Sequence, residues 1–299
     1  MITVFGSINM DLIATTERLP KPGETVAGNG FSTAAGGKGA NQALAARRAG
    51  SVVRMVGAVG RDEFAGPALA LLKEAGTDLS GAKPVDGPTG IALILVGGDG
   101  ENVIAVVPGA NGTLTAADAD AALAPMKAGD ILMLQFEIPV PAVEHALLRA
   151  KEKGVVTILN IAPLIAEAPR LGRLADVVIA NETEFERLAG ENGMDDARRE
   201  AAMQALHAQT GQTLIVTLGA DGVIAIRDGA VSRSAGLVID PVDTVGAGDT
   251  FCGYFAAGLD AGLDFATALR RAAVAGSLAC LEPGAQPSIP VSGEVSRRL

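Results

Sequence analysis

Long apolar segments are missing from this chain of 299 residues. The apolar runs at residues 131–134 and 155–159 have the length of strands, far below the roughly 18 residues that cross a membrane. The opening segment, residues 1–5, lacks the basic stretch and the long apolar core of a signal peptide, and it resembles a first strand. We therefore expect a cytoplasmic protein.

Cysteine and histidine are scarce, with two of each. Without a secretion signal, we expect no disulfide between Cys252 and Cys280, and we expect both to be small core residues. His145 and His207 lie far apart in helix-like stretches, where we expect them on the helix surfaces. Neither histidine has metal-ligand spacing, so the sequence predicts no zinc site.

Basic residues are outnumbered, 24 against 34 acidic ones, and the net charge is −10. This balance argues against partners that are broadly anionic, such as nucleic acid or an anionic membrane. It does not argue against a phosphate ligand, because backbone amides and one or two basic side chains can hold a phosphate locally.

Short β-branched segments alternate with segments rich in Ala, Leu and Glu. This alternation predicts a three-layer α/β fold, with a mostly parallel sheet and helices on both faces. The expected strands include residues 52–59, 131–134, 155–159, 177–179 and 214–217. The expected helices include residues 40–49, 63–75, 141–153, 182–189, 195–209, 247–259 and 264–280. No fixed-period repeat interrupts the pattern, and we expect one domain over residues 1–299.

Two segments break the alternation. Residues 12–34 contain strand-like pieces and no helix, and residues 89–107 indicate a hairpin whose turn is Gly-Gly-Asp-Gly at 97–100. These extra strands are either edges of the main sheet or a separate small sheet that covers a site as a lid. The pattern alone favours neither arrangement.

The strongest motif is Asp-Thr-Val-Gly-Ala-Gly-Asp-Thr-Phe at residues 243–251, just before an apolar helical stretch. Its small residues let the backbone present several N–H groups at a helix N-terminus, which suits the charge on a transferring phosphoryl group. Asp249 in the first turn can accept a proton from a substrate hydroxyl as that hydroxyl attacks phosphorus. The alternative is an aspartate that only caps the helix.

A second motif, Gly-Gly-Lys-Gly-Ala-Asn-Gln at residues 36–42, also precedes an Ala-rich helix. It is not a Walker A loop, because Gly39 follows Lys38 where Ser or Thr is required. Its glycines allow close approach of the backbone to a ligand, and Lys38 and Asn41 can bond polar oxygens. The alternative is an ordinary glycine-rich turn.

Two further motifs follow expected strands. Asn9 and Asp11 are two residues apart, so in an extended segment they share a face and suit two neighbouring sugar hydroxyls. Asn181 and Glu184 belong to Asn-Glu-Thr-Glu at a helix start, where carboxylates can orient hydrated Mg²⁺ or simply favour the helix N-terminus. Residues 181–183 and 111–113 match the glycosylation pattern, which a cytoplasmic chain does not use.

In this order and spacing, the four motifs resemble the ribokinase family of carbohydrate kinases, and the resemblance covers essentially the whole chain. The two family signatures are the blocks at residues 36–41 and 243–249. The resemblance implies a ribokinase-like fold and ATP-dependent phosphorylation of D-ribose at the 5-hydroxyl. A relative acting on a nucleoside or a ketose is the alternative within this class. A sugar sensor without turnover is another, although pure binding needs no base such as Asp249.

The resemblance also implies a role for individual residues. Asp249 matches the catalytic base, and the amides of Gly246, Ala247 and Gly248 match an anion hole. The polar groups expected to hold ribose are Asn9, Asp11, Gly37, Lys38, Asn41 and Glu137. Apolar contacts over the sugar are expected from Ala92, Ile94 and Val106, which favours the lid arrangement for residues 89–107.

Cofactors and assembly follow from the same resemblance. Asn181 and Glu184 match a motif associated with Mg²⁺ and phosphate. The expected ATP-binding loop contains Thr217, Gly219, Ala220, Asp221 and Gly222. A K⁺ site is expected from the side chains of Asp243 and Ser288 and the carbonyls of Val245, Ala279, Glu282 and Gly284. The resemblance further implies a homodimer formed through the lid.

Three positions depart from the family pattern. Tyr254 replaces a small residue close to Asp249, where it either crowds the nucleotide or fills core. Ala273 stands where a polar residue often lies near adenine. The segment Asn-Ile-Ala-Pro at residues 160–163 replaces Asn-Pro-x-Pro without an evident chemical consequence.

Overall fold

The computed structural model describes residues 1–299, and its largest element is a nine-stranded sheet in the order β13-β12-β11-β10-β9-β8-β1-β4-β5. Strand β1 (Ile2–Phe5) lies between β4 (Val53–Val59) and β8 (Ile131–Leu134) and pairs with both in parallel. Only the pairs β11–β12 and β12–β13 are antiparallel, so β12 alone runs against the other strands. The other strands are β5 (Asp78–Pro84), β9 (Val156–Asn160), β10 (Val177–Asn181), β11 (Thr213–Thr217), β12 (Val223–Arg227) and β13 (Ala230–Ser234).

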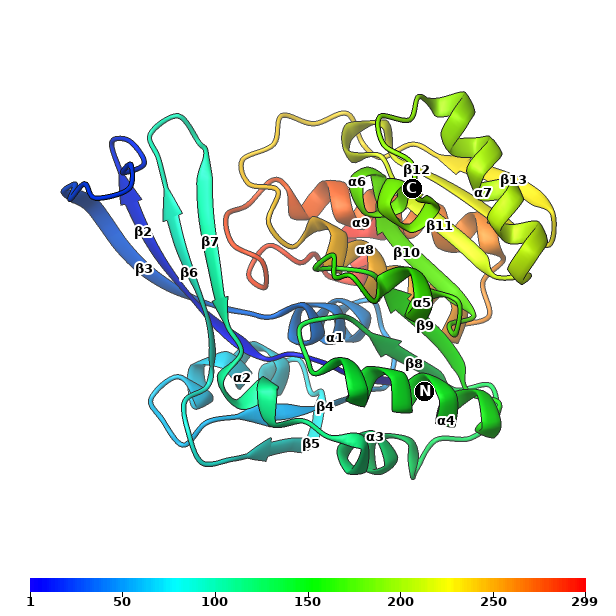
Figure 1. The fold of residues 1–299 in the computed structure, drawn as a ribbon, viewed down its shortest axis with the longest axis horizontal. Helices are drawn as coiled ribbons and strands as arrows, with labels where there is room; N and C mark the ends of the chain where they lie inside the picture. The colour runs from blue at the N-terminus through cyan, green and yellow to red at the C-terminus, as the bar shows by residue number, and fades with distance from the viewer.

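Helices cover both faces of this sheet, because the strand residues alternate between two apolar clusters. Val4 and Met133 belong to one cluster and Phe5 and Leu134 to the other. The first cluster contains residues of α1 (Lys38–Arg48), α2 (Ala65–Glu74), α8 (Ala247–Asp260), α9 (Phe265–Ala279) and α10 (Ser292–Ser296). The second contains residues of α3 (Ala116–Leu123), α4 (Val140–Lys153), α5 (Ala168–Gly172), α6 (Glu182–Ala189) and α7 (Asp196–Thr210). The predicted three-layer α/β fold is confirmed (Figure 1).

A second sheet has four strands in the order β3-β2-β6-β7. It consists of β2 (Asn9–Thr16), β3 (Gly28–Gly36), β6 (Gly90–Val96) and β7 (Asn102–Val107). Figure 1 shows this sheet extending away from the main body, with both hairpin tips at its far end. The extra strands are therefore a separate sheet and not edges of the large one, and the expected hairpin at residues 89–107 is present.

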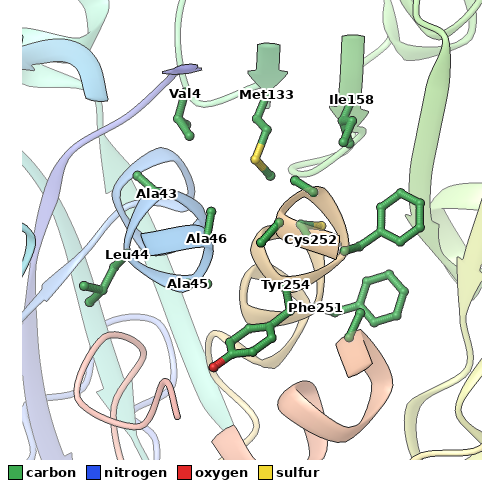
Figure 2. Packing of buried hydrophobic residues seen from close by; sticks show 14 of the residues in the cluster. Val4, Ala43, Leu44, Ala45, Ala46, Met133, Ile158, Phe251, Cys252 and Tyr254 are labelled. Carbon is green, nitrogen blue, oxygen red and sulfur yellow. The ribbon is translucent and has the colours of Figure 1, made fainter. Parts of the chain in front are cut away.

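Helices α1 and α8 pack side by side under the large sheet, and the small residues between them permit a close approach. Figure 2 shows Val4 and Met133 pointing from the sheet toward these two helices. A Cβ added to Gly253 would lie 2.5 Å from the Cβ of Ala45 and 2.6 Å from the carbonyl oxygen of Gln42. This contact aligns the first turn of α1 with the first turn of α8, where two of the sequence motifs lie.

Two of the three departures from the family pattern lie in the core. Tyr254 is buried, and its hydroxyl donates to the carbonyl oxygen of Pro290 at 2.8 Å, so it fills core as one of its two interpretations stated. Ala273 is also buried in the helical layer. Cys252 is buried as expected, whereas Cys280 at the end of α9 is only half-buried, and both are free thiols. None of the helices combines the length and the apolar character that crossing a membrane requires.

Candidate active site

Seven of the predicted site residues line one cavity at the carboxyl edge of the large sheet. The strand order reverses beside β1, because the chain continues to β4 on one side and to β8 on the other. At such a reversal the loops after neighbouring strands diverge and leave a crevice. A cavity at this edge is lined by Lys38, Asn160, Ala162, Ile179, Ala180, Asn181, Glu184, Thr217, Thr244, Gly246, Gly248, Asp249 and Cys252.

The carboxylate of Asp249 is held by two amides from α1. Asn41 Nδ2 donates to Asp249 Oδ2 at 2.9 Å, and Gln42 Nε2 donates to Asp249 Oδ1 at 2.9 Å. Asp249 is 7% exposed and remains in the cavity lining. With each oxygen bonded once, lone pairs remain on both oxygens for a proton from a ligand. Asn41, expected to hold the sugar, directs one N–H bond of its amide to this carboxylate.

A chain of buried amides fixes the direction of the Gln42 contact. Asn160 Nδ2 donates to the carbonyl oxygen of Ile179 at 3.2 Å, so Asn160 Oδ1 faces Gln42 and accepts from its Nε2 at 3.2 Å. Gln135 Nε2 donates to Gln42 Oε1 at 2.6 Å. A backbone carbonyl only accepts, so the Ile179 carbonyl fixes the orientation of each of these three side-chain amides in turn. Gln42 therefore presents a donor to Asp249. The sequence motifs include Gln42, but no role was expected for Gln42 or Gln135, and no consequence was expected from the segment that begins at Asn160.

The predicted anion hole lies at the start of α8. Gly246 and Gly248 line the cavity, and neither of their N–H groups donates to a protein acceptor. The N–H group of Ala247 donates to the carbonyl oxygen of Thr244 at 3.3 Å. Two of the three expected amides are thus free to bond an anion, and the partial positive charge of the helix N-terminus adds to them.

Glu137 joins the loop after β8 to the start of α1. Its Oε2 accepts from Ser7 Oγ at 2.6 Å and from the N–H group of Lys38 at 3.0 Å. Burial opposes the charge on the Lys38 ammonium, but Asp249, Glu137 and Glu184 outweigh it and raise the pKa of Lys38. Lys38 therefore stays protonated and offers a fixed positive charge to the cavity.

Asp11 lies in a crowded acidic environment. Burial raises its pKa from the usual 3.8 to about 7, the negative charges of Glu137 and Asp249 act in the same direction, and Lys38 partly opposes them. A Cβ on Gly36 would be 2.4 Å from Asp11 Oδ1, so a side chain there would displace the Asp11 carboxylate. At neutral pH the free protein therefore contains a mixture of protonated and ionised Asp11.

The register of the small sheet places the expected sugar-side residues on one face. Asn9 pairs with Gly90 and Asp11 pairs with Ala92 in neighbouring strands, and Ala92 pairs with Val106. Residues that pair across a sheet point to the same side, as do residues two apart in one strand, which adds Ile94. The expected apolar contacts thus lie on the same face as the two polar residues.

The Asn-x-x-Glu motif forms the capping box of α6. Asn181 Oδ1 accepts from the N–H group of Glu184, and Glu184 Oε2 accepts from the N–H group of Asn181, each at 2.8 Å. Both residues also line the cavity, and burial raises the pKa of Glu184. These two hydrogen bonds show that the motif does stabilise the helix start. They use only one oxygen of the Glu184 carboxylate, so the other oxygen is still available to a ligand.

The expected ATP loop is only partly in the cavity. Thr217, at the end of β11, is in its lining. Gly219, Ala220 and Asp221 form the turn that follows, and Gly222 has φ +88°, but none of these four residues lines the cavity. The turn therefore follows the lining residue Thr217 in the chain but does not itself line the cavity.

The loops expected to bind K⁺ are in contact. Asp243 Oδ2 accepts from the N–H group of Gly284 at 2.8 Å, and its Oδ1 accepts from the N–H group of Val245 at 3.0 Å. Ser288 Oγ donates to the carbonyl oxygen of Ala285 within its own loop. The hydrogen bonds of Asp243 to nearby amides are those expected of a plain helix-ending loop.

Several backbone oxygens of this region are free to bond a large monovalent cation. The four carbonyls that were expected as ligands accept no hydrogen bond within the protein; they belong to Val245, Ala279, Glu282 and Gly284. Unpaired carbonyls beside one carboxylate are a suitable donor set for such an ion, since each strongly polar carbonyl needs a partner.

Comparison with known proteins agrees with this geometry. A family model described as pfkB family carbohydrate kinase matches residues 1–292. A ribokinase of Bacillus subtilis is 38% identical over 100% of this chain and 99% of its own length. A deoxyribokinase of Salmonella typhi is 34% identical over 97% of this chain and 95% of its own length. The solved structure of Arabidopsis thaliana ribokinase complexed with ribose and ATP matches with a TM-score of 0.88 and 32% identity over 99% of this chain and 97% of that one.

The α/β fold, the free amides at a helix start and the buried carboxylate beside them are consistent with a carbohydrate kinase. The chain belongs to the pfkB family of carbohydrate kinases.

Proposed function

We propose that the protein phosphorylates D-ribose at its 5-hydroxyl with ATP, giving D-ribose 5-phosphate and ADP. The observation that carries the proposal is the position of Asp249, whose carboxylate lies beside the free amides of Gly246 and Gly248 and is held by Asn41 and Gln42. The similarity to ribokinases over the whole chain supports ribose as the sugar and ATP as the phosphoryl donor.

In the proposed reaction, the 5-oxygen forms a bond to the γ-phosphorus while the bond from that phosphorus to the β,γ-bridging oxygen breaks and ADP leaves. Asp249 takes the hydroxyl proton as the attack proceeds. The N–H groups of Gly246 and Gly248 bond the charge that spreads over the phosphoryl oxygens, and Lys38 adds a positive charge. Asn9, Asp11 and the apolar residues of the small sheet hold the sugar.

Magnesium fits the acidic side of the cavity. Glu184 has one oxygen free, and a carboxylate combined with waters and phosphate oxygens is the usual environment of Mg²⁺. When bound, the ion would neutralise phosphate charge. The residues that would hold it are Glu184, directly or through water, and Asn181 at the same helix start.

The proposal is tested by measuring how fast the purified protein forms ADP from ATP with each of four acceptors. These are ribose, 2-deoxyribose, fructose and adenosine. Ribose is expected to give the highest kcat/KM, with deoxyribose poorer because a buried polar group would lose its partner. A preference of more than about tenfold for fructose or adenosine would instead assign a ketose or nucleoside kinase.

Ribose binding is expected to release protons at neutral pH. Sugar hydroxyls that donate to Asp11 favour its charged form and lower its pKa from about 7. Roughly half a proton per sugar leaves at pH 7, and affinity rises between pH 6 and pH 8, because binding no longer has to displace the proton. Calorimetric titration in two buffers of different ionisation enthalpy measures the release. Asp11→Asn should release none, and equal release from that variant would assign the proton to another group.

Potassium is expected to raise the activity by ordering the loop that carries Gly246. Asp243→Ala removes the one carboxylate of the site and should abolish activation, whereas Glu282→Ala keeps its carbonyl and should retain it. Activity is measured while K⁺ replaces a bulky organic cation at constant ionic strength. Equal activity without K⁺ would refute the cation site.

The small sheet is proposed to act as a lid and to form a homodimer with the lid of a second copy. It exposes a set of large apolar side chains: Phe31, Leu93, Val103, Ile104, Val106 and Val107. An exposed apolar sheet with free edges associates unless it is covered. Sedimentation at micromolar concentration should give a dimer, and Val103→Asp should give a monomer. Val52→Asp, at an equally exposed valine outside the lid, is the control. A wild-type monomer would contradict the proposal.

A further inference from the structure

Asn111 is a buried polar residue that no sequence motif assigned to the site. It lies in the short 3₁₀ helix Gly109–Thr113, which follows the last strand of the small sheet, and it is 1% exposed. This burial excludes the glycosylation that its sequence pattern would allow in a secreted chain. Its side chain faces the start of β2, where Asn9 lies.

The orientation of the Asn111 amide is fixed by one peptide unit. Its Nδ2 donates to the carbonyl oxygen of Ile8 at 3.1 Å, and its Oδ1 accepts from the N–H group of Ile8 at 2.9 Å. A backbone N–H group only donates and a backbone carbonyl only accepts, so exchanging the nitrogen and oxygen of Asn111 would break both bonds. The position of its nitrogen therefore follows from the backbone.

This fixed amide sets the orientation of Asn9. The second hydrogen of Asn111 Nδ2 is donated to Asn9 Oδ1 at 2.7 Å. Because Asn111 Nδ2 has no acceptor capacity, the Asn9 atom that faces it is the oxygen. Asn9 Nδ2 donates to no protein atom and is not among the buried polar atoms that lack a partner, so it is accessible to a ligand.

The contact between the Asn111 and Asn9 side chains requires a residue without a side chain at position 90. A Cβ on Gly90 would lie 2.2 Å from Asn111 Nδ2 and 2.3 Å from Asn9 Oδ1. Gly90 pairs with Asn9 across the small sheet, so any side chain there would separate the two amides. The close approach of β6 to β2 is thus compatible only with glycine.

We propose that Asn111 is a positioning residue that makes Asn9 a hydrogen-bond donor toward the sugar. Ionised Asp11, two residues along the same face, is an acceptor, so the pair presents one donor and one acceptor to neighbouring sugar oxygens. The site thereby selects a vicinal diol in which one oxygen accepts and the next hydroxyl donates. This inference rests on the proposed function, because it assumes that Asn9 and Asp11 contact the sugar.

The wild-type enzyme tests this polarity with fluorinated sugars, since fluorine in place of a hydroxyl can accept weakly but cannot donate. The 2- and 3-hydroxyls are each replaced by hydrogen and by fluorine, on ribose or on whichever sugar the substrate panel selects. At the position facing Asn9, the fluoro sugar should exceed the deoxy sugar roughly tenfold in kcat/KM. At the position facing Asp11, the fluoro sugar and the deoxy sugar should have equally low kcat/KM. The same response at both positions would overturn the proposal.

The variant Asn111→Asp tests the residue itself. The new carboxylate can still accept from the N–H group of Ile8, but it cannot donate to Asn9, whose amide then turns and presents its oxygen to the sugar. The kcat/KM for the best sugar should fall roughly tenfold or more, chiefly through KM, and the advantage of the fluoro sugar should disappear.

A matched control separates this effect from general damage to the 3₁₀ helix. Thr113 Oγ1 donates to the carbonyl oxygen of Ala110 at 2.8 Å in the same turn without contacting Asn9. Thr113→Val should leave the fluoro-to-deoxy ratio unchanged. If Asn111→Asp keeps the wild-type ratio, Asn111 does not set the polarity of Asn9. If the wild-type protein does not phosphorylate ribose, the proposed function is refuted instead. The comparison of fluoro and deoxy sugars, made on the sugar that the panel selects, would still test the orientation of Asn9.

Discussion

Asp249→Asn is expected to lower kcat by roughly two to four orders of magnitude, the usual range for the loss of a general base. The amide cannot take the hydroxyl proton. It also places an NH₂ group against either Asn41 or Gln42, both of which donate to this carboxylate at 2.9 Å, so one of the two contacts is lost. The groups that hold the sugar lie on other elements, and ribose should still bind. The measurement is steady-state kcat together with calorimetric binding of ribose.

Asp260→Asn is the control, because Asp260 lies at the far end of the same helix, where it contacts the chain N-terminus. It removes an acidic charge from α8 without altering the cavity, and kcat should be unchanged. If Asp249→Asn retains more than about a tenth of the wild-type kcat, the proton goes elsewhere and the proposed role of Asp249 is wrong.

Gly246→Ala is expected to lower kcat by about two orders of magnitude, as the loss of one oxyanion-hole donor does. Gly246 has φ +79°, where an L-residue is strained, and a Cβ there would lie 2.8 Å from the Cα of Ala285. The backbone must move to relieve this contact, and the N–H groups at the start of α8 move with it. The thermal stability should fall as well, because the added Cβ meets the backbone of buried Ala285.

The matched control for this variant is Gly262→Ala. Gly262 also has a positive φ, +71°, but an added Cβ would meet nothing within 4 Å, and the residue lies in the turn after α8. It carries the same backbone strain, of order 1 kcal/mol, without touching the cavity. An equal loss of kcat in both variants would mean that strain in α8, and not displacement of the anion hole, lowers the rate.

The sequence was informative where function depends on local chemistry. The alternation of strands and helices predicted the layers, and the strand at residues 131–134 and the helix at 182–189 have the predicted bounds. The segment around Asp249 predicted a helix N-terminus with free amides, because small residues and a helix start are features of a few neighbouring residues.

The remainder of the site depends on contacts between distant segments. Gln42 lies 207 residues from Asp249 in the chain and meets it only because Gly253 lets α1 and α8 approach closely. Asn111 lies 102 residues from Asn9 and is fixed by the peptide of Ile8, for which a single sequence carries no sign. Gln42 lies in helix α1 and Asn111 in a short 3₁₀ helix, and neither local sequence indicates which distant group its amide meets. The start of a helix is a local property, whereas the orientation of an amide is set by whichever backbone group packs against it.

The small sheet is attached to the main body at one end only, and its other end projects freely. Its fixed end contains Asn9, paired with Gly36 on one side and Gly90 on the other, four residues beyond the end of β1. Its free end carries the exposed hairpin tips and the apolar side chains such as Phe31 and Val103. Bending along its length displaces the tips far more than the root. Substitutions near the tips can therefore change what the sheet meets outside the molecule, while the donor and acceptor at its root keep their geometry.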